Sequence, residues 1–346
     1  MKINRKPDYE QFLKVLWRKG EPNHLPFYEH YASPEFIANR MGVEMRQLGY
    51  DTPGSWKIYV DFWLGMGFDV VPMEIPLKCS LGEGHGAASE GSESKAVIRN
   101  WDDFDKYPWP DESSPINFEH FETVAQLLPD GAKIVGGVCM GPYEWASQMM
   151  GVMGLSFALA DTPELIDAVF GKLSSLIVSA DRQIATMDAV CSLRQGDDLG
   201  FKTATFLKPE LLRKLIFPTY KAAAEAAHAN GKPYILHSCG NLLEVYDDII
   251  DDCKVDAKHS FEDGIMSVVD FKKQFGRRIT PMGGLDVDVI CRSSIPDLKA
   301  YTRRHIEECF LSGDGYWALG TGNSLPDYMP VENYIAVLEE GIEVTR

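Results

Sequence analysis

Eight short apolar runs, separated by longer amphipathic segments, constrain the fold of this chain more than any other feature of its sequence. Each run ends in polar or glycine residues, as buried strands of a parallel sheet do. Strands that alternate with helices form βαβ units, and eight such units predict an α/β fold of the closed (β/α)8 TIM-barrel type. The runs span residues 25–31, 68–75, 133–142, 188–200, 232–240, 255–263, 277–286 and 315–323.

Helix signals between the runs support this interpretation. Segment 161–187 opens with Asp161 as the expected N-cap and Pro163 in the first turn, and segment 208–231 ends on the C-cap pair Asn230 and Gly231. An open, doubly wound sheet is the alternative. We discount it because Gly320-Thr321-Gly322 lacks the third glycine of a dinucleotide-binding motif.

We expect residues 1–346 to form a single domain, with an N-terminal helical extension before the first strand. Segment 77–113 interrupts the repeat after the second strand. It is rich in Gly and Ser and then in Trp, Asp and Pro. This composition predicts an insertion or loop over the barrel mouth, with residues 101–110 as an exposed connector.

The charge of the chain excludes several kinds of partner. Asp and Glu number 51 against 34 Lys and Arg, a formal net charge of −17 that repels nucleic acid and anionic membranes. The charged N-terminus has no signal-peptide core, and no apolar run is long enough to cross a membrane. The seven scattered cysteines do not suggest a disulfide framework, so we expect a cytoplasmic protein.

Polar residues end almost every predicted strand, and in such barrels the chemistry lies at the C-terminal strand ends. His237 and Cys239 are two residues apart at the end of the fifth run, so their side chains should point to the same side. An imidazole and a thiolate suit zinc, and Glu262 from the next strand could complete a three-ligand set. The alternative is a hydrogen-bonded histidine beside a buried cysteine. His259 is interpreted as a packed histidine rather than a ligand.

The second half of the chain resembles the uroporphyrinogen decarboxylase superfamily, and within it the corrinoid- and zinc-dependent methyltransferases. The matching stretches are residues 197–221, 231–241, 255–263, 283–290 and 318–338. The resemblance implies a (β/α)8 barrel that holds zinc through His237 and Cys239. The methyltransferases carry a later cysteine where this chain has Asn323, and fewer thiolates leave zinc a stronger Lewis acid. The arginine-rich segment that holds uroporphyrinogen is reduced to Arg40, which argues against that substrate.

The resemblance implies a zinc-dependent transfer of a methyl group from a small methylated substrate, an O-methyl ether, to a corrinoid on a separate protein. Asp197, Asp198 and Glu29 are the expected catalytic residues, and Glu29 is also an alternative metal ligand to Glu262. Homodimer formation stays open. The expected substrate contacts are Phe27, Tyr28, His30, Tyr31, Met140, Tyr143, Trp145 and Asn323.

Three alternatives are kept. The first is a methylcobamide:thiol methyltransferase. The second is a metal-free decarboxylase of a small substrate, in which Asp69 or Asp197 stabilises a protonated intermediate. The third is a barrel without catalytic activity that only binds a corrinoid protein or ligand.

Overall fold

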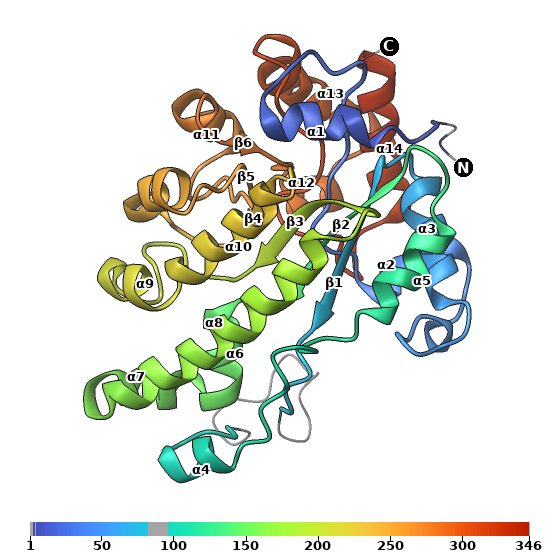
Figure 1. Cartoon of the computed structure of the whole chain (residues 1–346). Helices are drawn as coiled ribbons and strands as arrows, with labels where there is room; N and C mark the ends of the chain where they lie inside the picture. The colour runs from blue at the N-terminus through green and yellow to red at the C-terminus, as the bar shows by residue number, and fades with distance from the viewer. Residues whose placement is uncertain (1–2, 4, 82–95, 346) are drawn as a thin grey trace.

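The computed structural model describes residues 3, 5–81 and 96–345. Its central sheet has six parallel strands that follow one another in chain order, with helices between them (Figure 1). The strands are β1 (Val70–Pro76), β2 (Lys133–Cys139), β3 (Val190–Gly196), β4 (Tyr234–His237), β5 (Ala257–His259) and β6 (Thr280–Pro281). They correspond to the second to seventh of the eight predicted strands.

The first and eighth predicted strands are joined to the sheet by single bridges. Met282 bridges Ala318, and Phe27 bridges Leu319, both in the parallel sense. The arrangement therefore continues from β6 to residues 315–323 and on to residues 25–31. Gly283 has a φ of +67° and lies against the carbonyl of Thr321, where a β-carbon would clash. The close approach of the seventh and eighth runs therefore requires glycine at this position.

A cluster of buried side chains shows that all eight runs enclose one interior. It contains Phe12 and Leu16 of α1, which close the cluster at the N-terminal side of the barrel. Helix α1 is the predicted N-terminal extension. The other members come one from each run: Tyr28, Val70, Val135, Cys191, Ile235, Ala257, Met282 and Ala318. One residue from each of the eight runs therefore lies in a shared interior, as expected for a (β/α)8 barrel, so this fold prediction is confirmed.

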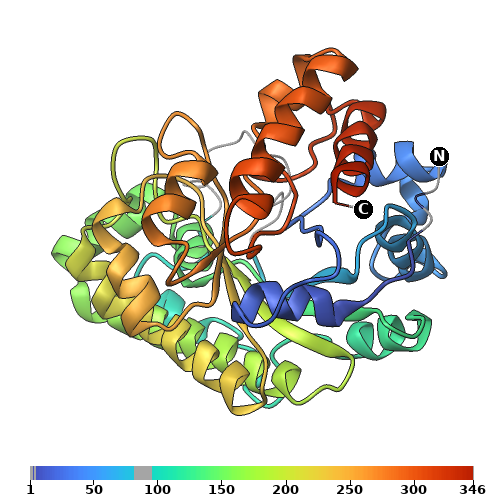
Figure 2. The ribbon, with the colours of Figure 1, turned by 90° about the horizontal axis from the view of Figure 1, so that it is seen from above.

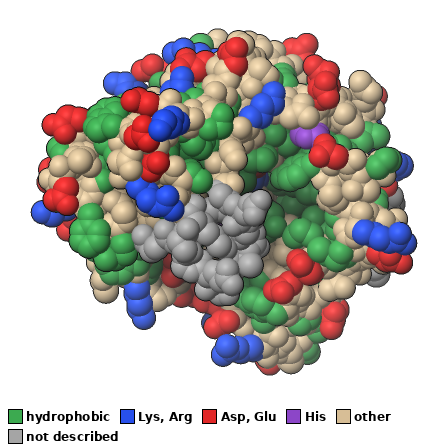
Figure 3. Space-filling view, turned by 90° about the horizontal axis from the view of Figure 1, so that it is seen from below, with side chains coloured by type: hydrophobic (Ala, Val, Ile, Leu, Met, Phe, Trp, Pro, Cys, Tyr) green, Lys and Arg blue, Asp and Glu red, His purple; other side chains and the backbone are tan. Residues whose placement is uncertain are grey.

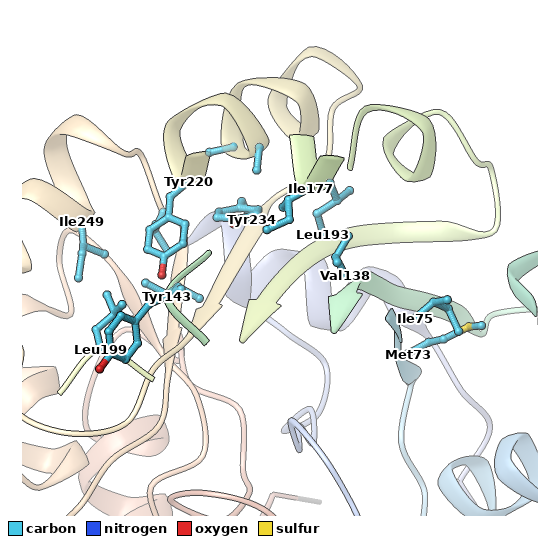
Figure 4. Close-up of a cluster of buried hydrophobic side chains, with 14 of the residues drawn as sticks. Met73, Ile75, Val138, Tyr143, Ile177, Leu193, Leu199, Tyr220, Tyr234 and Ile249 are labelled. Carbon is cyan, nitrogen blue, oxygen red and sulfur yellow. The ribbon is translucent and has the colours of Figure 1, made fainter. Parts of the chain in front are cut away.

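The helices surround the sheet when the molecule is seen from above (Figure 2). A larger apolar core fills the space between strands and helices, where Val138 and Leu193 of the sheet lie near Ile177 of α8 (Figure 4). The helices before β3 are α1 (Tyr9–Trp17), α2 (Pro34–Met41), η1 (Met45–Gln47), α3 (Ser55–Gly65), α4 (Trp101–Lys106), α5 (Glu119–Leu127), α6 (Pro142–Met150), α7 (Val152–Asp161) and α8 (Pro163–Ala185). Those after it are α9 (Pro209–Leu215), α10 (Phe217–Ala229), η3 (Leu243–Val245), η4 (Asp248–Asp252), α11 (Val268–Phe275), α12 (Val287–Arg292), α13 (Ile295–Ile306), η5 (Glu307–Leu311) and α14 (Val331–Val344).

Helix boundaries differ from the predictions in three places. Thr162, not Asp161, precedes α8, because Asp161 is the last residue of α7. The predicted helix over 208–231 divides into α9 and α10 at Ile216, where Pro218 cannot donate a hydrogen bond back to α9. Within the predicted connector, α4 is a short helix capped by the side chain of Asn100.

Part of the predicted insertion, residues 82–95, lies outside the described residues. Among the residues that the structure describes, no helix is both long enough and apolar enough to span a membrane.

Candidate metal centre

The pair that the sequence singled out lies at the end of β4. His237 is the last residue of the strand, and its Nε2 atom is 3.6 Å from Sγ of Cys239. Asp198, which follows β3 on the neighbouring strand, places Oδ1 3.8 Å from the same Nε2. The ligand atoms of these three residues all lie within 4.8 Å of one another. One nitrogen, one sulfur and one oxygen ligand form a set that suits zinc.

The structure groups Asp198, rather than Glu262, with the histidine and the cysteine. Glu262 accepts a hydrogen bond from the backbone N–H of Gly240 (3.2 Å) and so supports the loop that carries Cys239. Asp198 in turn accepts the N–H of Cys239 at 2.9 Å. The sequence analysis predicted Asp198 as a catalytic residue and did not predict its place in this three-residue group. The signal was present, since Asp198 follows a strand adjacent to the one that ends at His237.

The surroundings of Cys239 favour the neutral thiol unless a cation is present. Burial raises the pKa of this thiol to about 12, and the Asp198 carboxylate adds to that shift. The Nδ2 of Asn323 and the Oγ of Ser260 lie 3.4 and 3.5 Å from Sγ. Asn323 therefore contacts the predicted site. A carboxylate and a thiol held this close in a half-buried position are the arrangement that a divalent metal stabilises.

A chain of hydrogen bonds fixes which nitrogen of His237 faces Cys239. The backbone carbonyl of Thr321 can only accept, so Nε2 of His259 donates to it at 3.0 Å. Burial lowers the pKa of His259 to about 3, so this ring is neutral and its Nδ1 is an acceptor. His237 then donates from Nδ1 across a distance of 2.7 Å. Its Nε2 keeps a lone pair toward Cys239 and Asp198, as metal binding requires.

His30 connects this cluster to a buried ion pair. Its ring stacks on that of His237 with centroids 4.0 Å apart, and its Nε2 lies 3.0 Å from Oε1 of Glu74. The same Glu74 oxygen receives Nη2 of Arg194 at 3.0 Å. Sequence reasoning did not single out Arg194, which lies one residue before the polar end of β3.

Two of the predicted catalytic carboxylates lie in hydrogen-bond networks away from the cluster. Glu29 accepts from the backbone N–H of Thr321 (2.7 Å) and from the hydroxyl of Tyr334 (2.8 Å), which ties α14 to the eighth run. Asp197 accepts the backbone N–H of Glu144 (2.9 Å) and the hydroxyl of Tyr220 (2.7 Å). It therefore holds the first turn of α6. Burial raises the pKa of each carboxyl to about 7.

Five of the expected substrate contacts are buried: Phe27, Tyr28, His30, Tyr143 and Trp145. Tyr28 belongs to the barrel interior and is fully enclosed. Trp145 is buried and donates from Nε1 to the carbonyl of Cys139. Tyr143 stacks on the exposed Phe206, with centroids 5.5 Å apart. Of the aromatic side chains expected to contact substrate, His30 is the one whose ring stacks on that of His237.

The pKa values of Cys239 and His237 determine how metal binding should depend on pH. Cys239 binds as the thiolate, so each metal ion bound near neutral pH displaces one proton from a thiol whose pKa is about 12. His237 adds no further slope, because burial holds its pKa well below the usual value. We expect the zinc association constant, measured by chelator competition, to rise about tenfold per pH unit from about pH 6 to 8. Cys239→Asp should flatten this slope, and a flat profile in the unmodified chain would contradict thiolate ligation.

Comparisons with known proteins identify a family for this chain and a protein that shares its fold. The family model for uroporphyrinogen decarboxylase (URO-D) matches residues 32–343. A methyltransferase from Methanosarcina mazei shares the fold with a TM-score of 0.68 at 16% identity, over 96% of this chain and 97% of its own. An intracellular xylanase from Thermoanaerobacterium saccharolyticum matches with a TM-score of 0.44 at 10% identity, over 93% of this chain and 90% of its own. No curated protein sequence gives a significant match.

The fold and the cluster define a TIM-barrel protein with a candidate metal centre at the C-terminal ends of β3 and β4. The chain belongs to the uroporphyrinogen decarboxylase family, as the resemblance in its second half predicted.

Proposed function

We propose that this protein is a cytoplasmic, zinc-dependent methyltransferase that moves a methyl group from a small O-methyl ether to a corrinoid on a separate protein. The observation that carries the proposal is the cluster of Asp198, His237 and Cys239 within 4.8 Å at the catalytic end of the barrel. Its fixed histidine tautomer favours a metal role over packing. Membership of the decarboxylase family and the shared fold of a methyltransferase support the same class.

In this proposal, three side chains hold the zinc and leave one position open for substrate. The ligand atoms are Nε2 of His237, Sγ of Cys239 and Oδ1 of Asp198. When bound, zinc supplies a Lewis acid that stabilises negative charge on the oxygen that leaves the methyl group. One thiolate in the ligand set, with Asn323 where the thiol methyltransferases have a second, makes an oxygen leaving group a better substrate than a thiol.

Glu144 is the proposed proton source for the leaving oxygen. It lies in the first turn of α6, beside the two aspartates that end β3. Burial, together with Asp197 and Asp198, raises its pKa to about 9, so the carboxyl carries a proton at neutral pH. The methyl carbon–oxygen bond breaks with its electron pair on oxygen, which takes this proton. The electron pair of the new bond to the methyl group would come from Co(I) of the corrinoid on the separate protein.

Among the contacts of the described residues, none favours the metal-free decarboxylase. Asp69 lies at the other end of β1, where it accepts hydrogen bonds from Arg5 and from the backbone of Asp8. It also lies 2.9 Å from Nε2 of His24. Asp197 is bound to α6 and to Tyr220, as described above. Neither carboxylate is placed to stabilise a cationic intermediate at the barrel mouth.

Removing the metal should abolish methyl transfer. The experiment measures methylation of Co(I) cobalamin by absorbance, with a panel of methyl ethers and methyl thioethers as donors. We expect chelator-treated protein to lose at least about 100-fold in rate and to recover with zinc but not with magnesium, which prefers oxygen ligands. Full activity in metal-free protein would refute the zinc mechanism. Faster transfer from thioethers than from ethers would favour the thiol methyltransferase instead.

A further inference from the structure

A cavity of about 200 Å³ opens beside the candidate metal centre, and its walls are largely aromatic. Tyr31, Tyr50, Trp56 and Tyr59 line it, and Glu74 and Arg194 lie on its strand side. From below, which is the direction in which β1 points in Figure 1, the molecule shows a hollow bordered by hydrophobic side chains (Figure 3). A pocket with apolar walls and few polar groups is typical of a small-molecule site.

Two of the aromatic side chains that line the cavity already have hydrogen-bond partners for their polar atoms. Tyr59 donates its hydroxyl to the carbonyl of Pro72 at 2.6 Å, and Trp56 donates from Nε1 to His120 at 3.2 Å. These residues therefore present ring surface, rather than hydrogen-bonding groups, to whatever fills the cavity. A flat ring is the ligand shape that stacked and edge-on aromatic contacts favour.

Glu74 gives this cavity one specific acceptor. Its Oε1 takes all the bonds that the structure records for the carboxylate: Nε and Nη2 of Arg194, at 3.1 and 3.0 Å, and Nε2 of His30 at 3.0 Å. Within the described residues, Oε2 has no hydrogen-bond partner. Arg194, which is 2% exposed, offsets the charge of the carboxylate. The second oxygen is thus a fixed acceptor that lacks a donor.

His30 places this acceptor next to the metal cluster. The ring lines the cavity, bonds to Glu74 and stacks on His237 with centroids 4.0 Å apart. A ligand in the cavity therefore ends beside the imidazole that would hold the metal. The cavity is the place for the part of the substrate that remains after its methyl group has been transferred.

We propose that this pocket selects a neutral aromatic ring bearing a hydroxyl group, which donates its hydrogen bond to Oε2 of Glu74. The proposal rests on the proposed function, because it identifies the leaving group. That group is an aromatic alcohol with a hydroxyl group on its ring in addition to the oxygen that loses the methyl group. A ring that carries a carboxylate instead of a hydroxyl meets the negative oxygen of Glu74 and is disfavoured. Glu74 thereby becomes a specificity-determining residue.

The test compares phenol with anisole as probes, by calorimetric titration of the chain without added metal or corrinoid. Phenol can donate to Glu74 and anisole cannot, so we expect phenol to bind about tenfold more tightly, as one charge-assisted hydrogen bond allows. Glu74→Gln should reverse the preference. Its amide oxygen is drawn to Arg194 and His30, which leaves an NH2 donor where Oε2 was, and anisole accepts from such a donor.

Two further variants guard against misfolding of Glu74→Gln. Leu48→Trp adds bulk at the half-buried rim of the cavity and leaves the ion pair intact, so it should weaken both probes at least about tenfold. Glu35→Gln makes the same charge change at an exposed position outside the cavity and should leave both affinities unchanged. Equal affinities for phenol and anisole, or tight binding in Leu48→Trp, would overturn the proposal.

This titration is independent of methyl transfer. Phenol binding with the expected preference in a protein that transfers no methyl group would retain the pocket and refute the proposed function. Methyl transfer by a protein that lacks this preference for phenol would retain the proposed function and refute the proposed selectivity of the pocket.

Discussion

Replacing His237 or Cys239 with alanine should reduce bound zinc from about one ion per chain to near zero. Each change removes one of the three ligand atoms that lie within 4.8 Å of one another. Asp198→Ala should behave in the same way, because its Oδ1 is the third ligand atom. Losing one of three protein ligands should weaken the site by about 1,000-fold or more, since structural zinc affinities of about 10 kcal/mol and above are shared among few ligands.

The measurement is the metal content of anaerobically purified protein by elemental analysis, with folding checked by circular dichroism. Cys291→Ala is the matched control, because this half-buried thiol lies on α12, away from the cluster. Glu262→Ala separates the two candidate third ligands. It removes the bond to the N–H of Gly240 but, on this geometry, should leave the zinc in place. Loss of zinc in Glu262→Ala with retention in Asp198→Ala would restore the ligand set predicted from the sequence.

The barrel could be predicted because it depends on patterns that local sequence records. Each of the eight apolar runs supplies one residue to the buried interior cluster, from Tyr28 in the first run to Ala318 in the eighth. The proximity of His237 and Cys239 follows from the two-residue period of an extended chain. Local sequence does not show that the first and eighth runs are joined by isolated bridges rather than by regular ladders, or that Gly283 packs directly against Thr321.

The roles of neighbouring acidic residues depend on tertiary structure in the same way. Asp197 and Asp198 are adjacent in sequence, but Asp197 bonds to α6 while Asp198 lies beside His237. Glu29 and His30 diverge likewise, one bonding to Tyr334 and the other stacking on His237. Successive residues of an extended segment face opposite sides, so one member of each pair reaches the mouth. Which member does so is set by strand register, and register is fixed by packing across the whole barrel.

His259 shows what the sequence-based interpretation omitted. It was expected to be a packed histidine, and it is fully buried. Its two nitrogens, however, connect the carbonyl of Thr321 to Nδ1 of His237. The residue type alone does not predict this role, because the arrangement needs β4, β5 and the eighth run side by side. His259 therefore orients His237, and it would affect a metal at the cluster only through that residue.

Removing the acceptor at position 259 should weaken zinc binding by about 10- to 100-fold, the range typical of groups that orient a metal ligand. In His259→Leu the Nδ1–H of His237 loses its buried hydrogen-bond acceptor. The ring then no longer prefers the tautomer in which Nε2 is unprotonated and presents its lone pair to Cys239. In His259→Asn the side-chain oxygen can stand where Nδ1 of the histidine stood, so the affinity should stay within a few-fold of the original. These two side chains are similar in size, so the pair isolates the hydrogen bond from the packing.

Zinc affinity by chelator competition gives the first readout. The nitrogen-15 shifts of His237 give the second, and they should report Nδ1 protonation in His259→Asn and a tautomer mixture in His259→Leu. Equal losses in both variants would show that His259 acts through packing alone, and the tautomer argument for a metal at His237 would then fail with it.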